Sequence, residues 1–430
     1  MNKYFLKKQD LIQSNIDKIL NRVEDENNKV EIAVKDIIER VKKDGDAALI
    51  SYTKEFDKVE LSQLKVTDEE IEEAFKQTEP GFIRVLEEAK GNIIQFHKCQ
   101  VQETWKKEFS SGVVLGQKVT PIPRVGLYVP GGKGGYPSTV LMDAIPAMVA
   151  GVDSIALITP PNSEGKVNSD ILAAARVAGI TEIYKVGGAQ GIAALAYGTE
   201  TIPAVNKIVG PGNIFVATAK KLVFGKVDID MIAGPSEICI IANSSNNPVF
   251  IAADMLSQAE HDEMASSFLI TTDESLADKV SLEVERQLEL LPRKEIIKKS
   301  IQNNGKIFVV ETLEDAIELS NIIAPEHLEV MVEEPFHYLD FIKNAGAIFL
   351  GEYTPEPVGD YFAGPNHTLP TSGTSKFSSP LGVYDFVKKS SIIFYEKKSL
   401  ENIKDQVIQF AQREGFDAHG NTIKVRFEEN

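Results

Sequence analysis

Four of the six histidines in this sequence lie in short segments that also carry glutamate, aspartate or glutamine. Histidine titrates near neutral pH and binds metal ions, and carboxylate or amide oxygens complete many metal sites. The segments are far apart along the chain, so only folding can bring them together. They predict one metal-assisted active site built from residues 258–261, 326–327, 359–367 and 418–419.

Gln258 and His261 are spaced three residues apart on a predicted helix, with Asp254 on the same stripe. Residues three and four apart share one helix face, so an amide oxygen and an imidazole nitrogen could bind one divalent ion. Asp360 and His419 could complete a set of nitrogen and oxygen ligands that suits zinc. The competing interpretations are a solvated helix face, a turn aspartate and an exposed terminal histidine.

Glu326 and His327 are adjacent and follow Ala324-Pro325, and the residue before a proline is biased away from helix. In an extended segment the two side chains point in opposite directions, so they could handle protons in different tasks. The alternative is a polar pair at the start of a strand.

Two glycine-rich turns follow predicted strands, at residues 130–135 and 210–213. A strand, a glycine loop and a helix in that order suit a phosphate or dinucleotide at the helix N-terminus. The first loop does not fit G-x-G-x-x-G, and no acidic residue ends a second strand about 20 residues on. Each cluster could also be only a tight turn.

The elements that must position these segments alternate between strands and helices after residue 124. This alternation predicts parallel sheets covered by helices on both faces, in two α/β units. Residues 1–100 read as helical, 104–121 as a hairpin, 352–382 as a long irregular segment and 400–412 as a final helix. The fold class is therefore α/β, with two incomplete Rossmann-like parallel-sheet domains, a helical N-terminal region and a C-terminal arm.

The bulk composition is that of an ordinary globular protein of two main domains. A formal net charge of −17 argues against broad contact with nucleic acid or an anionic membrane. The N-terminus lacks the apolar stretch of a signal peptide and no run could span a bilayer, so we expect a cytoplasmic protein. Cys99 and Cys239 cannot form a disulfide framework; Cys239 reads as a core residue, the alternative being a thiol nucleophile.

Taken together, the sequence resembles the histidinol dehydrogenase family over roughly residues 30–425. The motifs come in the family's order, and the ordered set is highly specific. They are Tyr128-Val129-Pro130-Gly131-Gly132, Tyr136-Pro137-Ser138-Thr139-Val140-Leu141-Met142, Gly187-Gly188-Ala189-Gln190, Lys207-Ile208-Val209-Gly210-Pro211-Gly212-Asn213, Ala233-Gly234-Pro235-Ser236-Glu237, Gln258-Ala259-Glu260-His261-Asp262, Ala324-Pro325-Glu326-His327-Leu328, Gly364-Pro365-Asn366-His367 and Glu414-Gly415.

The resemblance implies oxidation of L-histidinol to L-histidine, through the aldehyde, in two NAD-dependent steps. It implies a homodimer with shared active sites, and one zinc ion per subunit. The implied metal ligands are Gln258, His261, Asp360 and His419, and the implied bases are Glu326 and His327. The implied substrate contacts are Ser236, Gln258, His261, His327, Asp360, His367, Glu414 and His419, and the implied NAD contacts are Tyr128, Gln190 and Asn213.

The implied domains are an N-terminal helical arm (1–22), an α/β domain with the metal and catalytic residues (23–105 and 240–375), an NAD-binding α/β domain (106–239) and a dimerisation arm (380–430). Three other functions stay open. A related zinc and NAD dehydrogenase could act on another small polar alcohol. A zinc hydrolase would not need the two glycine-rich loops that suit a nucleotide. A non-catalytic binding module would not need two adjacent proton-accepting side chains at Glu326 and His327.

Overall fold

The computed structural model describes residues 1–20, 28–131 and 135–428. The chain divides into two compact units, Met1–Gln100 with Ile122–Phe386, and Val101–Pro121 with Val387–Asn430. The expected boundary after residue 22 and the centre of the first glycine loop, residues 132–134, lie outside the described residues.

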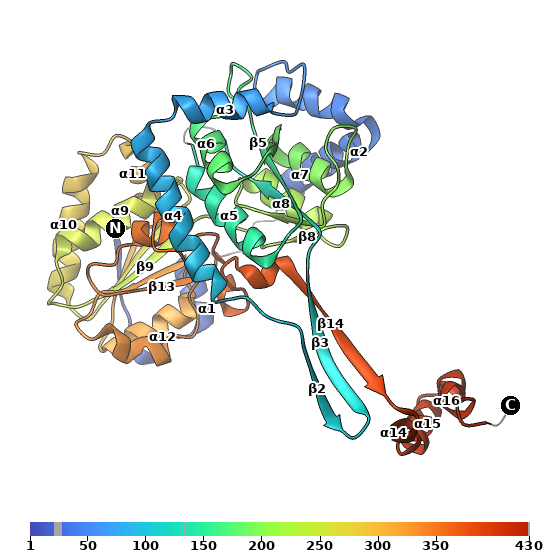
Figure 1. Cartoon of the computed structure of the whole chain (residues 1–430). Helices are drawn as coiled ribbons and strands as arrows, with labels where there is room; N and C mark the ends of the chain where they lie inside the picture. The colour runs from blue at the N-terminus through green and yellow to red at the C-terminus, as the bar shows by residue number, and fades with distance from the viewer. Residues whose placement is uncertain (21–27, 132–134, 429–430) are drawn as a thin grey trace. The chain divides into compact units, whose positions relative to one another are not determined.

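The first unit contains a five-stranded parallel sheet in the order β6-β5-β4-β7-β8 (Figure 1). Its strands are β4 (Arg124–Tyr128), β5 (Ser154–Thr159), β6 (Glu182–Lys185), β7 (Lys207–Val209) and β8 (Asp228–Ile229). The order reverses between β4 and β7, which is the strand order of a doubly wound sheet without its sixth strand. The predicted incomplete Rossmann-like domain is confirmed.

Helices cover both faces of this sheet because its strands are apolar on both sides. Helices α3, α4, α5 and α6 pack on one face of the sheet, and helices α2, α7 and α8 pack on the other. Their bounds are α2 (Asn28–Phe56), α3 (Asp68–Gln77), α4 (Pro80–Lys98), α5 (Pro137–Ala150), α6 (Ser169–Ala178), α7 (Gly188–Tyr197) and α8 (Ile214–Val223).

A second parallel sheet has six strands in the order β1-β11-β10-β9-β12-β13. Its strands are β1 (Asn2–Phe5), β9 (Glu237–Ala242), β10 (Ser266–Thr271), β11 (Lys306–Val309), β12 (His327–Val330) and β13 (Ala347–Leu350). Without β1 it repeats the topology of the five-stranded sheet, with its reversal between β9 and β12.

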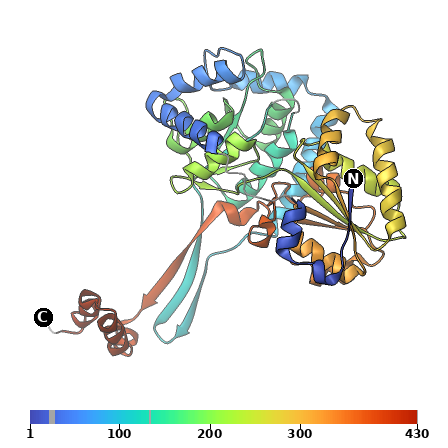
Figure 2. The same cartoon turned by 180° about the vertical axis from the view of Figure 1, so that it is seen from behind.

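Helices α9, α10 and α11 cover one face of the six-stranded sheet, and α1 with α12 covers the other, as Figures 1 and 2 show. Their bounds are α1 (Gln13–Leu20), α9 (Pro248–Ala259), α10 (Glu274–Leu288), α11 (Lys294–Asn304) and α12 (Leu313–Ile323). A short helix, α13 (Glu356–Tyr361), follows β13, and 3-10 turns lie at η1 (Lys8–Asp10), η2 (Pro335–Phe341), η3 (Thr374–Lys376) and η4 (Val383–Phe386).

The second unit is a three-stranded antiparallel sheet followed by three helices. Its elements are β2 (Trp105–Ser110), β3 (Val113–Pro121), β14 (Val387–Tyr395), α14 (Lys397–Glu401), α15 (Lys404–Arg413) and α16 (Asp417–Lys424). The predicted hairpin at 104–121 is confirmed as β2 and β3, and β14 pairs with β3 along nine residues.

Several expectations about the fold need correction. Helices α2, α3 and α4, expected in one domain with residues 240–375, pack on the five-stranded sheet, because their apolar side chains join its two cores. The hairpin of β2 and β3, expected in the NAD-binding domain, belongs to the second unit, because β3 pairs with β14. Residues 2–5 form a strand rather than part of a helical arm, because they pair with Lys306–Val309 of β11. The chain enters the six-stranded sheet at Glu237, three residues before the expected boundary at 240, since all of β9 pairs with β10. The segment 352–382 is not wholly irregular, because α13 forms within it. No described helix combines the length and the apolar character that crossing a membrane requires.

Candidate active site

His327 is the first residue of β12, so its ring lies at the amino edge of the six-stranded sheet. Nδ1 of the ring lies 2.9 Å from the backbone carbonyl oxygen of Glu237, the first residue of β9. A carbonyl oxygen can only accept, so Nδ1 carries the hydrogen and donates it. Nε2 of the neutral ring therefore keeps its lone pair, and it has no hydrogen-bond partner among the described residues.

Glu326 precedes the strand and converges with His327. Ala324 closes α12 in the left-handed conformation (φ 51°), and Pro325 prevents the helix from continuing. The Glu326 Oε2 accepts the backbone N–H of Glu237 at 2.8 Å and lies 3.7 Å from His327 Nδ1. The expectation that the two side chains point in opposite directions is wrong, because Glu326 lies outside the extended strand.

Burial and neighbouring carboxylates set the protonation of this pair. Burial raises the pKa of Glu326 to about 7, against the opposing effect of His327. Burial lowers the pKa of His327, but the charges of Glu326, Asp360 and Glu356 outweigh it and raise that pKa to about 10. A divalent cation beside these carboxylates would cancel their charge and release the His327 proton.

Donor atoms that suit a metal ion meet next to His327. Ligand atoms of His261, Glu356 and Asp360 all lie within 4.8 Å of one another. The Asp360 Oδ1 is 3.7 Å from His327 Nε2. Burial raises the pKa of Asp360, but the neighbouring imidazoles of His327 and His367 outweigh it and lower that pKa.

Gln258 is fully buried near the end of α9, and its side-chain oxygen and nitrogen have no hydrogen-bond partner among the described residues. Leaving a buried amide unpaired costs about 1–3 kcal/mol, so this amide is a candidate to bind a ligand. The backbone N–H of His261 donates to the carbonyl of Gln258 at 3.2 Å, which keeps both residues at one helix end. The residue types and the unpaired amide fit a metal ion such as zinc.

Sequence reasoning missed the acidic residues behind the site. Glu356 is buried with its pKa raised to about 8 by burial and by Asp360, and its backbone N–H donates to Glu329 at 2.8 Å. Burial and the charge of Asp254 of α9, which the sequence placed on the stripe of Gln258, raise the pKa of Glu329. The spacing of Glu356 and Asp360, one helical turn, could have revealed Glu356 only if α13 had been predicted.

His367 connects this cluster to the five-stranded sheet. Its Nδ1 lies 3.0 Å from the backbone carbonyl oxygen of Asp360, and its Nε2 lies 3.3 Å from the Thr139 hydroxyl of α5. Ser236, which directly precedes β9, is half-buried, and its carbonyl accepts the N–H of Ser266 at 2.9 Å. Both predicted substrate contacts thus belong to segments that border the Glu326-His327 pair.

The three predicted NAD contacts lie at the carboxyl edge of the five-stranded sheet. Tyr128 ends β4, and its hydroxyl accepts the N–H of Gly188 at 3.3 Å; burial raises its pKa to about 12. Gln190 is buried in the first turn of α7. The Asn213 oxygen caps α8 by accepting N–H groups from its first turn, so only its amide nitrogen is left for a ligand.

Glu414 and His419 belong to the second unit. Glu414 caps α15 and His419 lies in α16. Both side chains are exposed, and the His419 ring packs on Phe416 with centroids 5.2 Å apart. They are the two predicted site residues that do not belong to the first unit.

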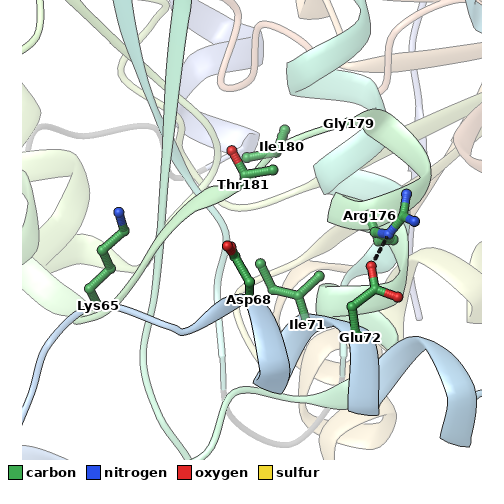
Figure 3. A pocket seen from close by; sticks show the side chains of 8 residues that line it. All are labelled: Lys65, Asp68, Ile71, Glu72, Arg176, Gly179, Ile180 and Thr181. Atoms are coloured by element: carbon green, nitrogen blue, oxygen red, sulfur yellow. Dashed lines mark hydrogen bonds and ion pairs between the residues drawn. The ribbon is translucent and has the colours of Figure 1, made fainter.

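A separate surface hollow of about 500 Å³ lies where α3 meets the end of α6 (Figure 3). Its basic Arg176 is already paired with Glu72 at 2.6 Å, and Lys65 and Asp68 also line it. It contains none of the predicted site residues, so it is not a candidate for the active site.

Known proteins resemble this chain over nearly its whole length. The family profile described as histidinol dehydrogenase matches residues 20–427. Histidinol dehydrogenase from Clostridium acetobutylicum is 57% identical over 402 residues, covering 94% of this chain and 93% of the relative. That from Listeria monocytogenes serovar 1/2a is 54% identical over 424 residues, covering 97% and 99%. The crystal structure of histidinol dehydrogenase from Elizabethkingia anophelis has a TM-score of 0.92 at 39% identity, covering 99% of this chain and 98% of that chain.

Proposed function

This chain belongs to the histidinol dehydrogenase family, and we propose that it oxidises L-histidinol to L-histidine through histidinal in two NAD-dependent steps. These are the last steps of histidine biosynthesis, and we propose that they take place in the cytoplasm. The observation that carries the proposal is the buried Glu326-His327 pair beside the donor atoms of His261 and Asp360.

His327 is proposed as the base of the alcohol step. Its Nδ1–H is held by the Glu237 carbonyl, so Nε2 is the atom that can take a proton. His327 would accept the hydroxyl proton of the alcohol while hydride leaves the carbinol carbon. One bound NAD would accept that hydride and leave as NADH. A second NAD would then bind and accept the hydride that is released once water has added to the aldehyde.

Glu326 is proposed as the base that activates water in the aldehyde step. A carboxyl with a pKa of about 7 can hold a proton or release it near neutral pH, as a general acid–base group must. The N–H of Glu237 fixes the carboxylate, so the proton exchanges at a defined position. No cysteine thioester is required, consistent with Cys239 being buried in β9.

Gln258, His261, Asp360 and His419 are proposed as the ligands of one zinc ion per subunit. The unpaired amide of Gln258 and the meeting of His261 with Asp360 support this set. Bound zinc would hold a substrate that offers amine and imidazole nitrogens, which supplies orientation. Ser236, His367 and Glu414 are proposed to complete the substrate contacts.

NAD is proposed to bind where the strand order reverses, at the carboxyl ends of β4 and β7. Tyr128, Gln190 and Asn213 line up along this edge. We also propose a homodimer in which the exposed His419 and Glu414 serve the partner's site, which would explain why they belong to a unit separate from the bases.

The test is NADH formation from L-histidinol, followed by absorbance, with the product identified by mass spectrometry. The proposal expects two NADH and one histidine per histidinol, with the rate abolished by a chelator. A single NADH with the aldehyde as final product, or NADH formation only from another alcohol, would favour the related dehydrogenase. Amide hydrolysis without NADH would favour the zinc hydrolase.

A further inference from the structure

Three consecutive residues next to the candidate site are bound by one face of α5. The Asn366 amide donates to the Met142 carbonyl at 2.5 Å, and the Thr368 hydroxyl donates to buried Asp143 at 3.1 Å. Between them, His367 Nε2 lies 3.3 Å from the Thr139 hydroxyl. Positions 139, 142 and 143 share a helix face. The hydrogen bonds of Asn366 and Thr368, the residues on either side of His367, therefore keep His367 opposite Thr139.

The contacts of His367 fix which ring nitrogen carries the hydrogen. The carbonyl of Asp360 can only accept, so Nδ1 at 3.0 Å is the donor. In the neutral ring Nε2 is then an acceptor, and the Thr139 hydroxyl must donate to it. Thr139 is 2% exposed, and within the described residues this is the only hydrogen bond that its hydroxyl makes.

Resting on the proposed function, we propose that Thr139 is a positioning residue, which holds His367 in the Nδ1–H tautomer and in one ring orientation for the substrate. Without the hydroxyl, one hydrogen bond instead of two would hold the ring, so a turn about its Cβ–Cγ bond, and with it exchange of tautomers, would cost less free energy. The loss would weaken substrate binding before it slowed the chemistry, since the hydrogen bond that the Thr139 hydroxyl makes within the described part of the chain goes to His367 and not to Glu326 or His327.

The first test compares Thr139→Val, which keeps the shape and loses the hydroxyl, with Thr139→Ser, which keeps the hydroxyl. Thr139→Val is expected to raise KM for L-histidinol roughly fivefold, in line with one lost hydrogen bond, with kcat and zinc content near wild type. Thr139→Ser should restore KM. The matched control is Thr78→Val, which removes a buried hydroxyl that donates to the Ala74 carbonyl, away from the candidate site; its KM should not change.

The second readout does not depend on activity. Nitrogen NMR of histidine-labelled protein, assigned with His367→Gln, should show His367 protonated at Nδ1 in the wild type and a mixture of tautomers in Thr139→Val. An unchanged His367 spectrum and an unchanged KM in Thr139→Val would overturn the inference. Failure of the proposed function would look different, because wild-type protein would then not oxidise histidinol while the tautomer result would still stand.

Discussion

Desolvation controls the chemistry of the residues around His327. Glu326, Glu329 and Glu356 each have a raised pKa, with burial as the largest cause. Glu326 and His327 could be identified from the sequence because two proton-handling residues stand side by side. The hydrogen bonds that both side chains make to the backbone of Glu237 could not be predicted from the sequence. Only the pairing of β12 with β9 brings that backbone next to them.

Glu326→Gln tests the proposed division of labour. The amide cannot accept a proton from water, so turnover should fall by about a hundredfold or more, and histidinal oxidation should suffer more than histidinol oxidation. Zinc content should be unchanged. Single-turnover measurements from each substrate would decide, and a variant that oxidises histidinal at the wild-type rate would rule out this role for Glu326.

Asp57 provides a pH-dependent prediction away from the bases. Burial raises the pKa of this half-buried carboxyl to about 6, and its Oδ2 has no hydrogen-bond partner among the described residues. As pH rises from about 4 to 6, the unfolded chain loses this proton before the folded protein does, so stability falls until the pH exceeds the folded pKa. Asp57→Asn should therefore raise Tm above about pH 6, with the gain shrinking toward pH 4. A gain that is constant across thermal melts in this range would contradict the assignment.

At the scale of elements, the two sheets use opposite edges. The predicted NAD contacts lie near the carboxyl ends of the strands, close to the reversal of strand order between β4 and β7. Open α/β sheets commonly bind their ligands at such a point. His327 and Glu237 instead begin β12 and β9, at the amino edge of the six-stranded sheet. Strand periodicity predicted both sheets, but it contains no information about which edges face each other. Here α5 and residues 366–368 join the two edges.

Gly210 lies in the turn after β7, at the sheet edge where NAD is proposed to bind. Its φ is +117°, and a Cβ there would lie 2.1 Å from the Tyr128 carbonyl oxygen. Gly210→Ala should lose about 3 kcal/mol or more of unfolding free energy and weaken NAD binding. The control Gly179→Ala has a φ of +85° but no atom within 4 Å of the new Cβ, so it should lose only about 1 kcal/mol. Equal losses in urea unfolding would show that the close contact is unimportant.

At the scale of the whole molecule, the predicted site residues are divided between two units. The first holds both proposed bases and most of the expected ligands, and the second holds Glu414 and His419. Family resemblance could assign these two residues because it compares whole motifs. Spacing could not, since an exposed histidine near a chain end has no local feature that distinguishes it from a surface residue.

Mixing two inactive variants tests whether sites are shared. Glu326→Gln and His419→Ala proteins should each be nearly inactive, but a mixed dimer has one site with both residues intact if His419 serves the partner. Random reassociation should then recover roughly a quarter of wild-type activity. Absence of any recovery, in a mixture shown to exchange subunits, would place His419 in the site of its own chain.

The most direct test of the account is the zinc content of purified protein, measured by mass spectrometry in the wild type and in Gln258→Ala. Buried Gln258 has no other partner for its amide among the described residues, whereas Gln287 on α10 already bonds the Val249 carbonyl and serves as the control. We expect about one zinc per chain in the wild type and in Gln287→Ala, and far less in Gln258→Ala, with NADH formation falling in parallel. A Gln258→Ala protein that keeps its zinc and its activity would contradict the proposed metal site.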